Sequence, residues 1–416
     1  MRFLSALLLA AMLAAPATAE TVLIRDGRVV TNSVAGIITG GDVLIVDGRI
    51  SAIGADIAAP RGARVVEAQG RYVTPGAFAA MSELGLSEIS GSGAPNDADV
   101  EGELVAAAAD AGRAFNPEVT AVAVTRMEGV TRAAIAPSET ATMFGGRGAL
   151  VSLGGGADSV FGQSAFMVVE LGETGATRTG SSRAALWPVF EAALRDAREY
   201  PGRYRSGQGG AVLNEIDAQA LAPFARGQGM FLAHAESAAD IRRIIAFKRD
   251  NPSLRFAIHG GAEAWQVAAE LARADIPVLI DPLANLPDRL ERLSARLDNA
   301  ALLNQAGVRF AIAPAPGSGD AHQARLALQL AGNAVANGLP WEAAFAAVSR
   351  GPADIFGVGA QLGRLERGYL ADVVLWDGDP LQVTSAPTAV FIEGREQPLA
   401  SRQTRLRDRY NPSRQR

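Results

Sequence analysis

The sequence contains no cysteine, a single lysine and three histidines among its 416 residues. Without cysteine, thiol catalysis, thiolate metal sites and disulfide bonds are excluded, so the fold must be held by its hydrophobic core. The one lysine, Lys248, restricts any chemistry that requires a lysine to a single position. The formal net charge of −5 argues against a nucleic-acid partner.

Residues 1–19 have the pattern of a secretory signal peptide. Arg2 gives a positive start, an apolar run follows over residues 3–13, and a small-residue A-x-A pattern ends at Ala19. A membrane anchor is the alternative, but the apolar run is short for a span and a cleavage site follows it. The sequence therefore predicts export, to the periplasm in a Gram-negative cell, with a mature chain that begins at Glu20. No later stretch reaches about 18 uninterrupted apolar residues, so no membrane span is expected in the mature form.

The pattern of apolar and turn-forming residues along the chain predicts an α/β protein. The predicted fold is a (β/α)8 barrel with a small β-sandwich built from both chain ends. Short strands and Asp-Gly turns fill residues 20–74 and return in residues 357–400. Residues 75–356 alternate apolar runs with amphipathic segments, which is typical of βα units around a parallel sheet. Roughly 280 residues of such units fit a barrel. Residues 401–416 form an arginine-rich tail of a kind that is usually solvated and disordered.

Two of the three histidines end apolar runs that are separated by one helical segment. His234 ends the run in "GMFLAHAE", and His259 ends the run in "LRFAIHGG". Catalytic groups of a barrel lie at the carboxyl ends of its strands, so both rings are expected at one rim. Neutral imidazoles there bind zinc or serve as bases. A pair of core histidines bonded to backbone is the alternative, and the spacing leaves both interpretations open.

Several stretches follow the pattern of one known family. The stretch "YVTPGAFAAMSELGL" is similar to that family's entry strand, and "FLAHAES" and "AIHGG" are similar to the segments that supply its third and fourth histidines. The stretch "GLPWEAAFAAVSRGPADIFGVGAQLGRLERGYLADVVLWDGDPL" is similar to its closing helix and final sandwich strands. The chain thus resembles the amidohydrolase superfamily, in its imidazolonepropionase-like branch. The resemblance covers nearly the whole mature chain and implies a metal hydrolase of C–N bonds.

The expected metal site departs from the family pattern. The family's entry motif is Pro-Gly-x-x-Asp-x-His-x-His, and its last three fixed residues fall here on Ala79, Met81 and Glu83. The bridging carboxylated lysine is lacking, since Lys248 lies in a helical segment. The aspartate of the family's final strand falls on Ala313 or the proline after it. The family's two-metal site is therefore expected to be absent, and its usual activation of water is in doubt.

A reduced site is the hypothesis that fits these departures. Because carboxylate oxygen ligates zinc, Glu83, His234 and His259 would form a set for at most one divalent metal, or a site with none. Asp281, which ends "IPVLID", and Glu88, near the entry strand, are candidates for the base that takes a proton from water. The plainer interpretations are a solvated carboxylate for Glu83 and a turn-forming residue for Asp281, which precedes a proline.

Two further side chains are candidates for contacting a substrate. His322 begins a helical segment after "GSGDA", and Arg147 lies in "GGRG", where backbone N–H groups could face an anion. Helix capping for His322 and a turn between strands at Arg147 are the plainer interpretations.

Three functions remain open from the sequence. The first is an exported hydrolase of C–N (non-peptide) bonds in a small amide, with at most one metal. The second is a non-catalytic barrel that binds a small molecule or a protein partner. The third is a metal-free enzyme that uses His234 or His259 with Asp281 or Glu83 as acid and base. The resemblance favours the first, and the pocket loops that set the substrate are the variable part of such barrels.

Overall fold

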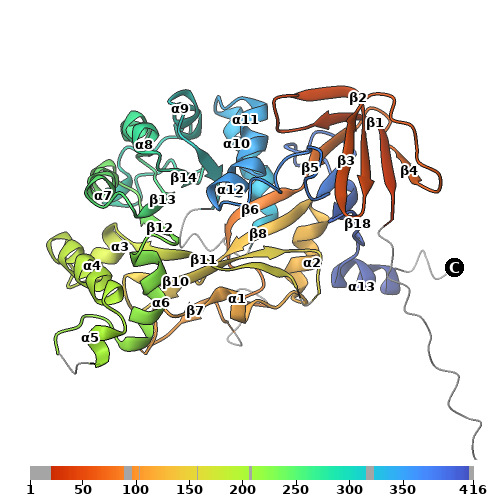
Figure 1. Ribbon diagram of the computed structural model, residues 1–416. Coiled ribbons are helices and arrows are strands. Elements are labelled where there is room, and N and C mark those ends of the chain that lie inside the picture. Colours follow the sequence, from red (N-terminus) through yellow and green to blue (C-terminus); the bar gives the residue numbers. More distant parts are fainter. Residues whose placement is uncertain are drawn as a thin grey trace, which may run out of the picture.

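Two eight-stranded β-sheets, with helices and one short two-stranded sheet packed around them, make up the described part of the molecule (Figure 1). One is a nearly closed barrel, and the other gathers strands from both ends of the chain. The computed structural model describes residues 20–88, 96–102, 104–156, 158–205, 209–314 and 323–411. The predicted signal peptide and His322 lie outside the described residues.

The barrel sheet has eight strands in the order of the chain. They are β6 (Ala77–Ser82), β8 (Val130–Ile135), β10 (Phe144–Ser152), β11 (Val160–Glu170), β12 (Met230–Ala235), β13 (Arg255–Gly260), β14 (Val278–Ile280) and β15 (Phe310–Ile312). The predicted α/β barrel is confirmed, with one departure. Strand β10 runs antiparallel to both of its neighbours, because it joins β11 through a hairpin and not through a helix.

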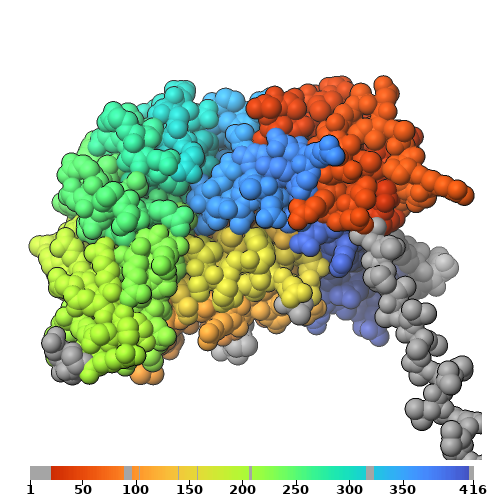
Figure 2. Space-filling model, in the orientation of Figure 1, coloured from red at the N-terminus to blue at the C-terminus, as the bar shows by residue number. Residues whose placement is uncertain are grey.

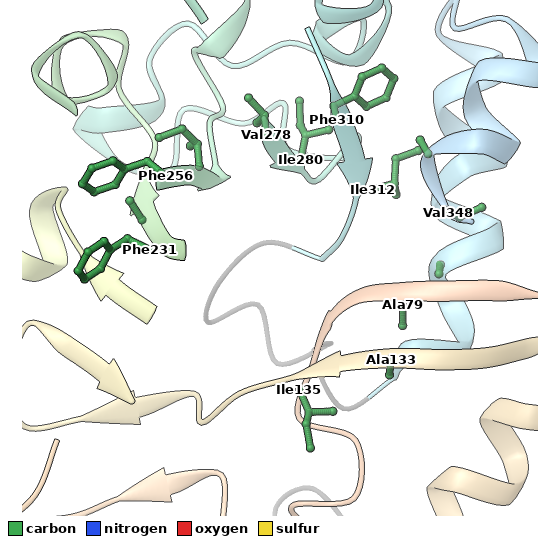
Figure 3. Packing of buried hydrophobic residues seen from close by; sticks show 14 of the residues in the cluster. Ala79, Ala133, Ile135, Phe231, Phe256, Val278, Ile280, Phe310, Ile312 and Val348 are labelled. Atoms are coloured by element: carbon green, nitrogen blue, oxygen red, sulfur yellow. The ribbon is translucent and has the colours of Figure 1, made fainter. Parts of the chain in front are cut away.

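The barrel strands are buried on both faces, which explains their continuous apolar runs. On the outer face, Phe231 and Phe256 stack at 5.4 Å between ring centroids and lie in the cluster beneath the helices (Figure 3). On the inner face, Phe78 and Phe166 pack against Phe356 in a separate cluster. Alternate residues of each strand therefore serve two different cores.

Helices cover the outside of the barrel. Some begin at a capping side chain, such as Ser237, which accepts from Asp240 N at the start of α7 (Ala238–Asp250). The barrel helices are α3 (Glu173–Arg178), α4 (Arg183–Arg198), α5 (Gly202–Arg205), α6 (Glu215–Ala225), α7 (Ala238–Asp250), η1 (Ala264–Val267), α8 (Ala268–Ala274), η2 (Leu290–Arg292), α9 (Asn299–Gln305), η3 (Ala324–Leu326), α10 (Ala327–Ala336), α11 (Trp341–Ala347) and α12 (Arg350–Ile355). The shorter elements before β10 are β7 (Asp99–Val100), α1 (Ala111–Ala114), α2 (Thr120–Met127) and β9 (Glu139–Thr140).

The second sheet confirms that the two chain ends come together. Its strands are β1 (Val22–Val30), β2 (Ile37–Val46), β3 (Arg49–Gly54), β4 (Arg64–Glu67), β5 (Tyr72–Pro75), β16 (Val373–Trp376), β17 (Pro387–Ile392) and β18 (Arg395–Glu396). Strand β5 pairs antiparallel with β16, where Thr74 lies opposite Val374. Strands from both ends supply one shared apolar cluster. This sheet also contacts the barrel through Asn32, whose side chain donates to Ser349 Oγ at 2.7 Å. Figure 2 shows the N-terminal part of the molecule, in red and orange, lying against the blue segment from the later part of the chain.

The arginine-rich tail differs from the disordered segment that its composition predicts. Its described part forms α13 (Arg402–Tyr410), which begins with a capping box between Ser401 and Thr404. No residue of α13 is buried, so local capping and not core burial holds its first turn. Among the described residues, every helix is too short or too polar to span a lipid bilayer.

Candidate active site

Three adjacent barrel strands place one ionisable side chain each at the same level. Glu170 of β11 lies opposite His234 of β12, and His234 lies opposite His259 of β13. Residues in register on parallel strands point to the same side of the sheet. All three lie at the carboxyl ends of their strands, where barrels carry their chemistry. The two histidines are thus neighbours at one rim, with 6.4 Å between ring centroids.

His234 is held between two carboxylates. Its Nδ1 lies 2.6 Å from Glu170 Oε2, and its Nε2 lies 3.4 Å from Glu236 Oε1. Ionised carboxylates only accept hydrogen bonds, so both ring nitrogens donate. Burial lowers the pKa of His234, but the charges of Glu170 and Glu236 and their hydrogen bonds outweigh burial and raise the pKa to about 10. His234 is therefore an imidazolium at neutral pH.

Three hydrogen-bond donors hold the carboxylate of Glu236 in place. Arg292 Nη2 donates to its Oε1 at 2.6 Å, Ala262 N donates to its Oε2 at 2.9 Å, and His234 supplies the third bond. Burial alone would raise the pKa of Glu236, yet the hydrogen bond and charge of His234, with Arg292, lower the pKa to about 2. Position 260 packs against this carboxylate and requires glycine, because a Cβ there would lie 2.8 Å from the carboxyl carbon of Glu236.

His259 differs from His234 in its charge. Its Nε2 lies 3.0 Å from the carbonyl oxygen of Pro314, which can only accept, so Nε2 donates and Nδ1 carries the lone pair. Burial and the positive charge of His234 lower the pKa of His259 to about 4. A neutral imidazole thus lies beside a charged one, and the two rings cannot have the same role.

Glu88 and Arg147, two of the predicted site residues, have structural contacts. Glu88 is exposed and accepts from Thr120 Oγ1 at 2.8 Å at the start of α2. Arg147 donates to Ala108 O at 2.8 Å and pairs with Asp110 at 3.2 Å, which ties β10 to the segment around α1. These contacts favour the plainer interpretation for both residues, and a role in a site remains a prediction.

Asp281 and Glu83 are both half-buried near the carboxyl ends of their strands. Asp281 follows β14, and its Oδ1 accepts from Leu283 N at 2.8 Å, so it shapes the turn that its following proline indicated. The same residue lines a cavity. Glu83 follows β6 directly. Catalytic or metal-binding roles for the two remain predictions.

Three contributors to the site were not predicted from the sequence. Glu170 ends the run "AFMVVE", the same pattern of apolar residues before a polar one that singled out the histidines. Glu236 follows His234 by two residues and could have been suspected from that spacing. Arg292 has no such sequence signal, because it belongs to η2, in the long connection after β14, and not to the end of a strand.

A barrel with ionisable groups at the carboxyl ends of adjacent strands is typical of enzymes, and comparison with known proteins identifies the class. The model of the Amidohydrolase family matches residues 191–399, about half of the sequence. The chain belongs to the amidohydrolase family.

Individual relatives agree with this assignment. A stretch of 60 residues is 50% identical to amidohydrolase tasK of Hapsidospora irregularis, covering 14% of this chain and 6% of that protein. Among solved structures, an amidohydrolase from Thermotoga maritima MSB8 has a TM-score of 0.80 at 24% identity, over 90% of this chain and 99% of that one. A molinate hydrolase has a TM-score of 0.56 at 18% identity, over 92% and 95%. At these identities the solved structures show a shared fold.

The family generally uses a divalent metal, but the side chains present here do not fit one. Within the described part of the chain, no three or more His, Asp or Glu side chains are placed to hold a metal ion. A histidine ligand must offer a lone pair, whereas both nitrogens of His234 face carboxylates. For the predicted set of Glu83, His234 and His259 to hold a metal, His234 would have to release one of its two carboxylates, and the set stays a prediction.

Proposed function

We propose that the protein is a hydrolase of C–N (non-peptide) bonds in small amides, with His234, His259 and Glu170 as the centre of its active site. Family membership and the hydrolases among its structural neighbours support a hydrolase. The position of the three residues at the carboxyl ends of β11, β12 and β13 supports the site. Export to the periplasm is part of the proposal and rests on the pattern of residues 1–19.

The observation that carries the proposal is the neutral ring of His259 beside the charged ring of His234. Nδ1 of His259 bears a lone pair at neutral pH and is the general base. It takes a proton from water as the water oxygen bonds to the amide carbon. When the C–N bond breaks, the same nitrogen returns the proton to the leaving amine. The imidazole of His259 is thus neutral again at the end of the reaction.

His234 acts in this scheme through its charge. Its N–H groups are occupied by Glu170 and Glu236, so it offers a developing oxyanion electrostatic attraction and not a hydrogen bond. The two carboxylates keep the ring protonated and oriented, and Arg292 balances the second of them. Glu170, Glu236 and Arg292 are positioning residues for this ring.

The experiment is amide hydrolysis by purified protein, followed as amine release over a panel of uncharged small amides. His259→Ala is expected to lower kcat/KM by about 10²–10⁴-fold, the usual contribution of a general base. The matched control is Arg249→Gln, which breaks only an exposed pair with Asp250 and should leave the rate unchanged. Activity that survives in His259→Ala would overturn the proposed site, and an inactive wild-type protein across the panel would overturn the proposed reaction.

A further inference from the structure

The barrel sheet is open between its first and last strands. Among the described residues, β6 and β15 are the two ends of the strand order and share no ladder. On the free edge of β6, Phe78 N donates to Val348 O, at 2.7 Å, and so bonds to the turn after α11 instead of to β15. Figure 3 shows Ala79 and Ile312 on the two strands that border this seam.

A cavity of about 130 Å³ lies at the seam. Met81 of β6, Ile312 of β15 and Leu330 of α10 form its apolar walls. Asp281 and Gln323 are the two polar side chains among the described residues that line it. An apolar cavity of roughly 150 Å³ is large enough to bind benzene, so this space suits a single ring or a branched alkyl group of similar size.

The cavity adjoins the candidate active site through one residue. Pro314 lines the cavity, and its carbonyl oxygen accepts the hydrogen bond from His259 Nε2 at 3.0 Å. Met81 also lines the cavity and stands where the family pattern has a histidine, so an apolar wall replaces a polar ligand there. The cavity and the neutral imidazole are thus neighbours at one end of the barrel.

We propose that this seam cavity binds the apolar group of the substrate, and that the substrate is an uncharged amide bearing one aromatic ring or a branched alkyl group of that size. The inference rests on the proposed function, because the amide of the same molecule must reach His259. The apolar walls disfavour a charged group in the cavity. The apolar walls contribute the affinity, and the neighbouring imidazole performs the chemistry.

The test uses 4-fluorobenzamide as the probe and fluorine NMR as the readout, because one spectrum reports both binding and hydrolysis to 4-fluorobenzoate. Ala327→Phe adds a ring to the cavity wall from α10 and is expected to weaken binding at least tenfold. Ala336→Phe places the same ring on the exposed side of that helix and should not change binding. Leu330→Ala enlarges the cavity and is expected to improve binding of 1-naphthamide relative to 4-fluorobenzamide.

The outcomes separate the two proposals. Binding that is lost in Ala327→Phe but kept in His259→Ala, where hydrolysis stops, supports both. Probe binding that follows the cavity variants without any hydrolysis retains the cavity and overturns the proposed reaction. Hydrolysis that is indifferent to Ala327→Phe and Leu330→Ala, or the absence of saturable binding, overturns the cavity as the substrate site. If Ala327→Phe does not fold, the change of preference in Leu330→Ala decides.

Discussion

Arg132 and Asp372, which lie 240 residues apart, form a buried two-bonded ion pair between the barrel and the second sheet. Arg132 Nε donates to Oδ2 at 2.6 Å and Nη2 donates to Oδ1 at 3.0 Å, with the two side chains 3% and 6% exposed. Asp372 Oδ1 also accepts from Glu393 N at 2.9 Å. The pair therefore fixes strand β8 to the loop before β16 and to the turn after β17.

Removing one partner of this pair is expected to destabilise the protein strongly. Asp372→Ala leaves the guanidinium of Arg132 buried without its main partner, at a cost of about 3–5 kcal/mol in the free energy of unfolding. Urea denaturation measures this loss. The matched control is Arg309→Ala, which breaks an exposed pair with Asp275 and should cost no more than about 1 kcal/mol. A cost in Asp372→Ala as small as the control's would contradict the role of the pair.

Gly260→Ala is expected to damage the site and the fold together. The new Cβ meets the Glu236 carboxyl at 2.8 Å, and the backbone there has a φ of 103°, which side-chain-bearing residues rarely adopt. The backbone strain alone is about 1–3 kcal/mol. Gly307→Ala has a φ of 73° with open space around the new Cβ, so it reports the strain without the contact. Thermal unfolding and amide hydrolysis should both fall further in Gly260→Ala, and equal losses in the two variants would show that Glu236 is not displaced.

Stability should decrease in acid through His259. The pKa of His259 is lowered to about 4 from an ordinary 6.5, so between these values the unfolded chain takes up a proton that the folded protein does not. The free energy of unfolding is then lost as the pH falls from 6.5 towards 4, by up to about 3 kcal/mol from this group. Denaturation of wild-type protein and His259→Asn at pH 7 and pH 4.5 measures it. Parallel pH profiles for the two proteins would refute the buried neutral ring.

Glu236 extends the acid sensitivity to lower pH. Its pKa is lowered to about 2, so its stabilising contribution is present above the ordinary pKa of a glutamate and is lost as the pH falls towards 2. Arg292→Met removes a donor to Glu236 and should move that loss to higher pH. It should also lower kcat by about tenfold or more, since His234 loses a fixed partner. An unchanged kcat with an unchanged acid limb would argue against a positioning role for Arg292.

Chelation should leave amide hydrolysis within about twofold of its starting rate, because the general base of the proposed reaction is an imidazole and not a metal-bound water. The measurement pairs activity with elemental analysis before and after chelator treatment. Activity that disappears with the chelator and returns with one equivalent of zinc would contradict this expectation. It would show that His234 releases a carboxylate and binds the metal, as in the predicted ligand set with His259 and Glu83.

Local sequence patterns were sufficient to predict the overall architecture of this protein. Apolar runs that end in His234 and His259 predicted two neighbouring strands with their rings at one rim, and the strand texture of both chain ends predicted their shared sheet. These features follow from the alternation of side chains along a strand and from the hydrophobic effect, both of which are written in short stretches of residues.

Only the tertiary structure decided the state of the site. The sequence treats His234 and His259 alike, yet one lies between two carboxylates and the other against a carbonyl, so their pKa values move in opposite directions. The partners that cause this come from other strands and from η2, and Arg292 has no local signal at all. The reversed strand β10 likewise depends on a hairpin replacing a helix. Charge and pairing are set by neighbours distant in the chain, because electrostatic interaction depends on separation in space and on burial, neither of which a local pattern specifies.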